Sequence, residues 1–437
     1  MAQKPRIDVS LSLKESQATG AELAELAESI APGVWFNTPL GDPEGPGRKP
    51  DVTWDLSGSR AKGQAGVYYA NPDKRLRRPF IFADGFSYGP SKIAPLFEYF
   101  NTPYEEGKPG FFDQLLARGI DVIVLGFRER HTRIQDNAEV AIQAITQAIA
   151  ERVTDERLIV GGVSMGGIVT RYALAKMETQ RMDHQTKTYI SYDSPHNGAW
   201  IPLILQQLAY FFDALATEKP SQADLIKSPA AQQLLWAWVP DSKYSGEVAT
   251  SSPLRKEFLE DLERVGNFPR IPRLLGVSNG RGDGVGLPLT PGEVAFDWQA
   301  IVASATARIQ PDKGDQQRVG GMHAVTLTGT EIRRSTTTEV PALDSVPGGT
   351  LDSFGRVADV LKAKILDDYR SGTFVPAVSA AALMFDPVAW NIDPTVDIST
   401  LSPEDFHLDA VEFDSANTEH SHVSGKLIDW IVEQIAY

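Results

Sequence analysis

Residues 157–171 read RLIVGGVSMGGIVTR and place a serine between an apolar strand pattern and a helical one. Ser164 lies in a G-x-S-x-G pattern, and a turn of this kind holds its serine with strained backbone angles that only small neighbours permit. Gly162, Gly166 and Gly167 supply those small neighbours. The stretch therefore predicts a nucleophilic serine. The alternative is a tight strand–helix junction without chemistry.

Strand and helix patterns alternate on both sides of this stretch. Candidate buried strands occupy residues 80–83, 121–126, 158–163 and 188–192, and helical periodicity covers residues 111–118 and 136–149. This alternation predicts a parallel sheet with right-handed crossovers and helices on both faces. Catalytic groups of such sheets lie at the carboxyl ends of the strands. Both Ser164 and the segment Asp84-Gly85-Phe86 fall there.

Three further segments differ in composition from this α/β pattern. Residues 200–268 carry many large apolar residues at helical spacing and predict a helical cap, although such residues often only bury one another. Residues 297–345 alternate in character and predict an inserted β-meander. Residues 1–77, rich in Gly, Pro and Asp, predict a peripheral β segment, which leaves residues 78–437 as the main domain.

Composition excludes several classes of protein. The formal charge of −15 argues against nucleic-acid binding, because phosphate contacts need clustered basic residues. The absence of cysteine excludes disulfides, thiol nucleophiles and cysteine-based zinc sites. No apolar run approaches the roughly 20 residues of a membrane span, so we expect no integral membrane segment. The N-terminus lacks the apolar core of a secretory signal, and we expect a cytoplasmic protein or a mature secreted one. The oligomeric state is not indicated.

A nucleophilic serine needs a base, and the sequence offers seven histidines. The favoured pair, His420 and His422, precedes the last helical pattern. We prefer His420 because it stands at the apex of the loop, further from the helix that follows. His196 lies near the site but earlier in the chain than the usual base. A metal site at His-x-His lacks further ligands at recognisable spacing, so we expect no metal and no cofactor.

The carboxylate that orients the base has more than one candidate. Asp283 follows a strand in a loop of small residues that could approach a histidine closely, and it is favoured. Asp193 is the strongest alternative because it also ends a core strand. Asp386 and Asp414 remain as further alternatives.

Two backbone N–H groups are expected to form an oxyanion hole. One belongs to Met165, directly after the nucleophile, and the other to Phe86, in the loop after the first central strand. Each donor typically contributes about 3 to 4 kcal/mol of transition-state stabilisation.

These motifs resemble the α/β-hydrolase superfamily, and within it the lipase and serine-esterase branch. Residues 162–167 match the nucleophile elbow, Asp84-Gly85-Phe86 is similar to the His-Gly-Phe segment of lipases, and residues 193–199 (DSPHNGA) are similar to Asp-Thr-Pro-His-x-Gly. The order Ser164, Asp283, His420 is also that of the superfamily.

The resemblance implies the α/β-hydrolase fold and the cleavage of carboxylic esters through an acyl-Ser164 intermediate. The apolar cap suggests a small-molecule substrate with a hydrophobic acyl or alcohol part. An acyltransferase, a thioesterase or a carbon–carbon bond hydrolase acting on polyketide-like substrates would use the same triad. A catalytically silent binding protein would keep the same fold.

Overall fold

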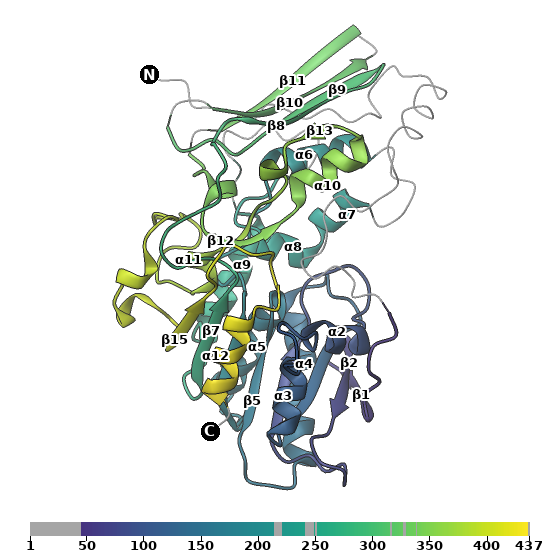
Figure 1. Ribbon diagram of the computed structural model, residues 1–437, viewed down its shortest axis with the longest axis vertical. Coiled ribbons are helices and arrows are strands. Elements are labelled where there is room, and N and C mark those ends of the chain that lie inside the picture. The colour runs from purple at the N-terminus through teal and green to yellow at the C-terminus, as the bar shows by residue number, and fades with distance from the viewer. Residues whose placement is uncertain are drawn as a thin grey trace.

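The computed structural model describes residues 45–213, 221–240, 249, 251–314, 317–326, 329–337 and 339–435. Its largest element is an eight-stranded sheet with the order β1-β2-β4-β3-β5-β6-β7-β15 (Figure 1). The strands are β1 (Val52–Ser57), β2 (Lys62–Tyr68), β3 (Pro79–Ala83), β4 (Asp121–Phe127), β5 (Leu158–Val163), β6 (Thr186–Tyr192), β7 (Arg273–Ser278) and β15 (Ala410–Phe413). The six strands from β4 to β15 in this order pair in parallel, which confirms the predicted sheet.

Helices cover both faces of this sheet because its strands are buried on both sides. One face carries α2 (Ile93–Phe100), α3 (Phe111–Ala117) and α12 (Gly425–Ile435) over an aromatic core. The other face carries α4 (Ile134–Glu151) and α5 (Met165–Thr179), with α9 (Pro253–Arg264) packed outside α5. Two separate apolar cores therefore hold the sheet between them.

The described part of the N-terminal segment, residues 45–77, contains strands β1 and β2. Residues 1–44 lie outside the described residues, and the remainder extends the central sheet. Strand β2 pairs antiparallel with β4, and β1 pairs antiparallel with β2. The reason lies in burial, because Val67 packs into the core on one face and its neighbour Tyr68 into the core on the other. A strand covered on both faces belongs inside a sheet.

A second lobe is built from the segments between β6 and β7 and between β7 and β15. Helices α6 (Leu203–Phe212), α7 (Gln222–Lys227) and α8 (Pro229–Leu234) come first along the chain. An antiparallel sheet of order β11-β10-β9-β8-β13 follows, at the opposite end of the elongated molecule from the central sheet (Figure 1). Its strands are β8 (Val294–Gln299), β9 (Ala303–Arg308), β10 (Gln317–Thr326), β11 (Gly329–Thr337) and β13 (Lys364–Ile365). These elements confirm the predicted helical insertion and the predicted β-meander.

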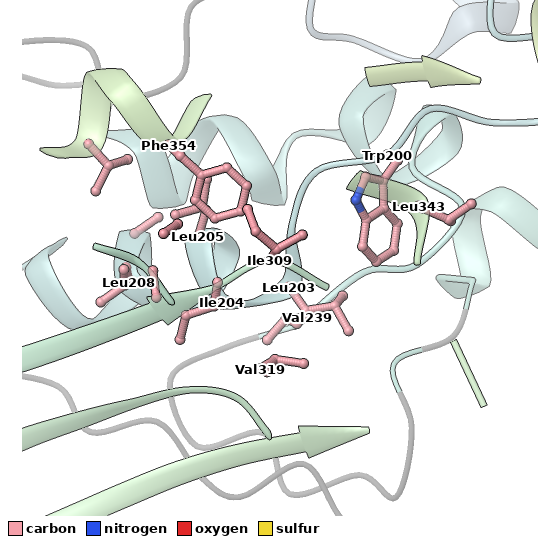
Figure 2. Close-up of a cluster of buried hydrophobic side chains, with 14 of the residues drawn as sticks. Trp200, Leu203, Ile204, Leu205, Leu208, Val239, Ile309, Val319, Leu343 and Phe354 are labelled. Carbon is pink, nitrogen blue, oxygen red and sulfur yellow. The ribbon is translucent and has the colours of Figure 1, made fainter. Parts of the chain in front are cut away.

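The large apolar residues of the helical insertion form the core of this second lobe. Leu203, Ile204 and Leu208 of α6 are at most 1% exposed and pack with residues of the meander and of α10 (Ser353–Leu361). Figure 2 shows them beside Ile309 and Phe354. These residues therefore bury one another, which was the alternative interpretation of their spacing.

A two-stranded sheet lies at the junction of the two lobes (Figure 1). Its strands β12 (Gly348–Leu351) and β14 (Gly372–Pro376) pair antiparallel, and the short helix α11 (Ala377–Ala380) follows β14. No helix among the described residues is both long enough and apolar enough to span a membrane.

Candidate active site

Ser164 occupies a sharp turn between β5 and α5. Its backbone angles are φ 54° and ψ −126°, which a residue with a side chain adopts only at a cost of about 1–3 kcal/mol. The turn fits because Gly166 passes the end of the neighbouring strand β3, where a Cβ atom would lie 2.2 Å from the carbonyl oxygen of Ala83. Ser164 itself is 2% exposed. The local geometry is that of a nucleophile elbow.

The predicted oxyanion segment begins beside this elbow. Strand β3 pairs directly with β5, with Ala83 opposite Gly162, so Asp84-Gly85-Phe86 follows immediately at the same sheet edge. Met165 is the first residue of α5, and its N–H has no partner within the helix because helices leave their first N–H groups unpaired. The structure thus brings Met165 and Phe86 to the same edge as Ser164.

A buried ion pair supports the loop that carries Phe86. Arg130 Nη1 lies 3.4 Å from Asp84 Oδ2, and both side chains are 3% exposed. The same guanidinium donates from Nε to the carbonyl oxygen of Gly89 and from Nη2 to that of Tyr88, both at 3.3 Å. Arg130 therefore ties the two ends of residues 84–89 together.

His420 contacts Asp193 in the interior of the protein. The distance from His420 Nδ1 to Asp193 Oδ2 is 2.5 Å, and both side chains are fully buried. The second carboxylate oxygen, Oδ1, accepts the backbone N–H of Asn279 at 3.0 Å. His420 Nε2 is buried and has no hydrogen-bond partner among the described residues. This nitrogen is therefore available to accept a proton.

Asp193 stands at the same edge of the sheet as Ser164, because β6 pairs with β5 and Asp193 directly follows β6. Its φ of 45° is positive, as is the φ of Ser164. Two strained residues at the ends of neighbouring strands are typical of functional sites.

The structure places Asp283, the acid favoured from the sequence, away from the pair of His420 and Asp193. Asp283 lies five residues beyond the end of β7, on the surface, where Arg281 binds its carboxylate and lowers its pKa to about 2. It does not contact His420. Of the other two candidates, Asp386 accepts backbone N–H groups in its own loop, and Asp414 accepts the hydroxyl of Thr418.

The structure places His420 and His422 in different surroundings, with the side chain of His420 buried. His422 is exposed, and only its carbonyl oxygen takes part in the site, where it accepts the Tyr192 hydroxyl at 2.6 Å and Asn279 Nδ2 at 3.0 Å. Asn279 therefore binds both Asp193, through its backbone, and the histidine loop, through its side chain. Sequence reasoning missed Asn279, although it directly follows the end of β7.

His196 shows the opposite arrangement from His420. Arg171 Nη1 lies 3.2 Å from His196 Nδ1, and because an arginine can only donate, Nδ1 accepts this hydrogen bond. The ring proton of the neutral histidine is therefore on Nε2, which lies 2.8 Å from Ser191 Oγ. Burial, and next the charge of Arg171, hold the pKa of His196 well below its usual range. His196 thus donates to its serine and cannot serve as a base toward it.

Two buried arginines fix the loop that follows Asp193. Arg255 Nη2 donates to the carbonyl oxygen of Asn197 at 2.6 Å, and Arg171 Nη1 contacts the carbonyl oxygen of His196 at 3.5 Å. Burial lowers the pKa of Arg171 to about 9 and that of Arg255 to about 10. Over the described ranges, no group of three or more His, Cys, Asp or Glu side chains is arranged to hold a metal ion.

The strand order, with an antiparallel edge followed by six parallel strands and an elbow after β5, decides the fold. It is an α/β-hydrolase fold. No protein-family model matches the sequence, and no curated protein matches it either.

Several solved α/β-hydrolases are similar to this chain. They include a lipase from Bacillus licheniformis, BlEst2 in mature form, at 15% identity over 53% of this chain and 73% of that one, with a TM-score of 0.28. An esterase from Pyrobaculum calidifontis is 12% identical over 58% and 69% of the two chains, with a TM-score of 0.31. EstE1, a carboxylesterase cloned from a metagenomic library, is 10% identical over 59% and 73%, with a TM-score of 0.32. At these values the likeness assigns no role to any residue of this chain.

Proposed function

We propose that this protein is a serine hydrolase that cleaves carboxylic esters through an acyl-Ser164 intermediate. The observation that carries the proposal is the buried contact between His420 and Asp193, at the sheet edge where the strained Ser164 lies, with His420 Nε2 left unpartnered. Ser164 is the nucleophile, His420 the base and then the acid, and Asp193 the carboxylate that orients the ring.

The reaction follows from these positions. Asp193 Oδ2 accepts the Nδ1–H of His420 and so keeps the lone pair on Nε2. Nε2 takes the hydroxyl proton of Ser164 as Oγ attacks the ester carbonyl carbon. The oxyanion that forms accepts the N–H groups of Met165 and Phe86. The intermediate collapses as His420 protonates the leaving alcohol, and water then releases the carboxylic acid from Ser164 by the reverse sequence.

The substrate is a small-molecule ester. Its hydrophobic part stays a prediction, because the apolar residues of the helical insertion that suggested it lie in the core of the second lobe. A series of p-nitrophenyl esters from acetate to palmitate measures the preferred acyl length directly. The same series extended to thioesters and to β-diketones distinguishes ester cleavage from thioester and carbon–carbon bond cleavage.

The decisive variant is Ser164→Ala. We expect kcat for p-nitrophenyl esters to fall by about 10⁶-fold, as it does when a serine hydrolase loses its nucleophile. We also expect a fluorophosphonate probe to label the wild type and not the variant.

The chain offers a matched control in Ser191, a second buried serine, whose Oγ lies 2.8 Å from His196 Nε2. Folded Ser191→Ala should retain both labelling and turnover. Failure of the probe to label folded wild-type protein would favour a catalytically silent binding protein, and undiminished turnover by Ser164→Ala would exclude the mechanism.

A further inference from the structure

Residues 348–350 of strand β12 cross the acid–histidine pair, and we call them the strap. They belong neither to the central sheet nor to any motif in the sequence with a known role. The second lobe fixes the strap on one side through its pairing with β14, where Gly349 lies opposite Val375. On the other side, the N–H of Gly348 donates to Asn417 Oδ1 at 3.1 Å, three residues before His420.

The strap lies directly against the carboxylate of Asp193. A Cβ atom built on Gly349 would lie 2.2 Å from Asp193 Oδ2 and 3.3 Å from the Cα atom of His420. Asp193 Oδ2 is the oxygen that accepts the hydrogen bond from His420 Nδ1. The backbone of Gly349 therefore lies close against this carboxylate, with no room for a side chain between them.

The strap also holds the histidine loop. The N–H of Thr350 donates to the carbonyl oxygen of Thr418 at 2.9 Å, and the carbonyl oxygen of Thr350 accepts the N–H of His420 at 2.8 Å. On β14, the strand paired with the strap, the ring of Phe374 lies edge-on to the imidazole, with centroids 5.0 Å apart and an interplanar angle of 67°. Two backbone hydrogen bonds and one ring contact thus fix the position of His420.

We propose that the strap is a positioning element for the Asp193–His420 pair, so that the second lobe sets the geometry of the base. The proposal rests on the proposed function. Its physical basis is that a buried charge-assisted hydrogen bond is strong only when water is excluded and the atoms are aligned. An error of about 1 Å in the position of a catalytic group costs roughly 100-fold in rate.

The test compares two glycines of the same small sheet. Gly349→Ala places a methyl group on the Asp193 carboxylate, whereas Gly372→Ala, on β14, places one where the nearest atom is 3.6 Å away. With p-nitrophenyl butyrate we expect Gly349→Ala to lower kcat by roughly 100-fold with KM within about twofold. Gly372→Ala should change neither by more than about twofold. A kcat of Gly349→Ala that equals that of the control, in folded protein, would overturn the proposal.

A second measurement is independent of turnover. A proton on His420 Nδ1 that is hydrogen-bonded to a carboxylate gives a proton NMR resonance far downfield of the amides. We expect this resonance in the wild type, in Ser164→Ala and in Gly372→Ala, and its loss or upfield shift in Gly349→Ala. Retention of the wild-type resonance in Gly349→Ala would also overturn the proposal.

Should Gly349→Ala not fold, Phe374→Leu takes its place. The substitution keeps an apolar side chain at a position that is 7% exposed and removes the ring edge from the imidazole. We expect a roughly tenfold lower kcat and an altered resonance, and wild-type values of both would count against the strap. If no ester is turned over but the resonance responds as expected, the strap stands and the proposed function fails.

Discussion

The substitution Asp193→Asn tests the assignment of the acid most directly. Asp193 accepts two hydrogen bonds, from the N–H of Asn279 at Oδ1 and from His420 Nδ1 at Oδ2. An asparagine has one oxygen for these two donors. If that oxygen keeps the N–H of Asn279, the amide NH₂ faces His420 Nδ1 and forces the ring proton onto Nε2. The histidine then holds the wrong tautomer and cannot accept the serine proton.

The size of the effect follows from the burial of the pair. Both side chains are fully buried, so no solvent screens the loss of the carboxylate charge. A triad that loses its carboxylate in this way typically loses about 10⁴-fold in kcat, or about 5 kcal/mol of transition-state stabilisation. Initial rates on p-nitrophenyl butyrate measure this loss, and thermal unfolding confirms that the variant is folded.

Asp283→Asn is the matched control, because Asp283 is the acid favoured from the sequence for its place after a strand, in a loop of small residues. Its carboxylate is on the surface and binds Arg281, so its removal should leave kcat within about twofold of the wild type. The reasoning fails if Asp283→Asn loses the activity and Asp193→Asn retains more than about a tenth of it.

Two further predictions concern stability. Arg130→Met removes the guanidinium from the buried carboxylate of Asp84 and should lower the free energy of unfolding by about 3–5 kcal/mol in urea titrations, whereas a loss below 1 kcal/mol would contradict a supporting role. Burial raises the pKa of Asp344 to about 6, although Trp200 Nε1 and the N–H of Gln310 donate to it. The protonated form of Asp344 is therefore favoured in the native state over the unfolded state. Its contribution to the free energy of unfolding is fully present below about pH 4 and is lost as the pH rises through about 6. Over that range the free energy of unfolding of the wild type should fall by roughly 3 kcal/mol relative to that of Asp344→Asn. A difference between the two proteins that does not change with pH would refute this.

The nucleophile elbow could be predicted because its geometry depends on adjacent residues. The strand, the small residues and the start of the helix that flank Ser164 all lie within residues 157–171, so one stretch of sequence contains the pattern. The parallel sheet was predictable for a similar reason, since each buried strand carries its own apolar run. The sequence alone therefore indicates the fold and the position of the serine.

The acid could not be chosen in this way, because β6 and β7 are neighbours in the sheet and the residues after both strands reach the same edge. The position of the strands therefore does not distinguish Asp193 from Asp283, and the loop of small residues led the sequence analysis to favour Asp283. The difference lies in two local facts. Asp193 follows its strand immediately, as Ser164 does, and Asp283 is preceded at two residues by Arg281, which captures it. A salt bridge between charged residues only two positions apart can be predicted from the sequence.

The spacing of apolar residues in the helical insertion indicated helices but not what those helices cover. Helical periodicity predicts the helix without identifying its partner, which for α6 is the meander more than 80 residues further along the chain. The role of residues 348–350 was likewise invisible, because their contacts with Asp193 and His420 exist only in the folded chain.

The contact between Asp193 and His420 joins residues that are 227 positions apart. Contacts of such long range form late in folding, because the entropy of closing a large loop must be overcome before the contact contributes any energy. Most of the second lobe lies within that loop, and the strap comes from it. A nascent chain that has already folded the strands and helices around Ser164 thus still lacks the contact between Asp193 and His420. Under the proposed function, Ser164 therefore gains its base only when the C-terminal segment has joined the sheet.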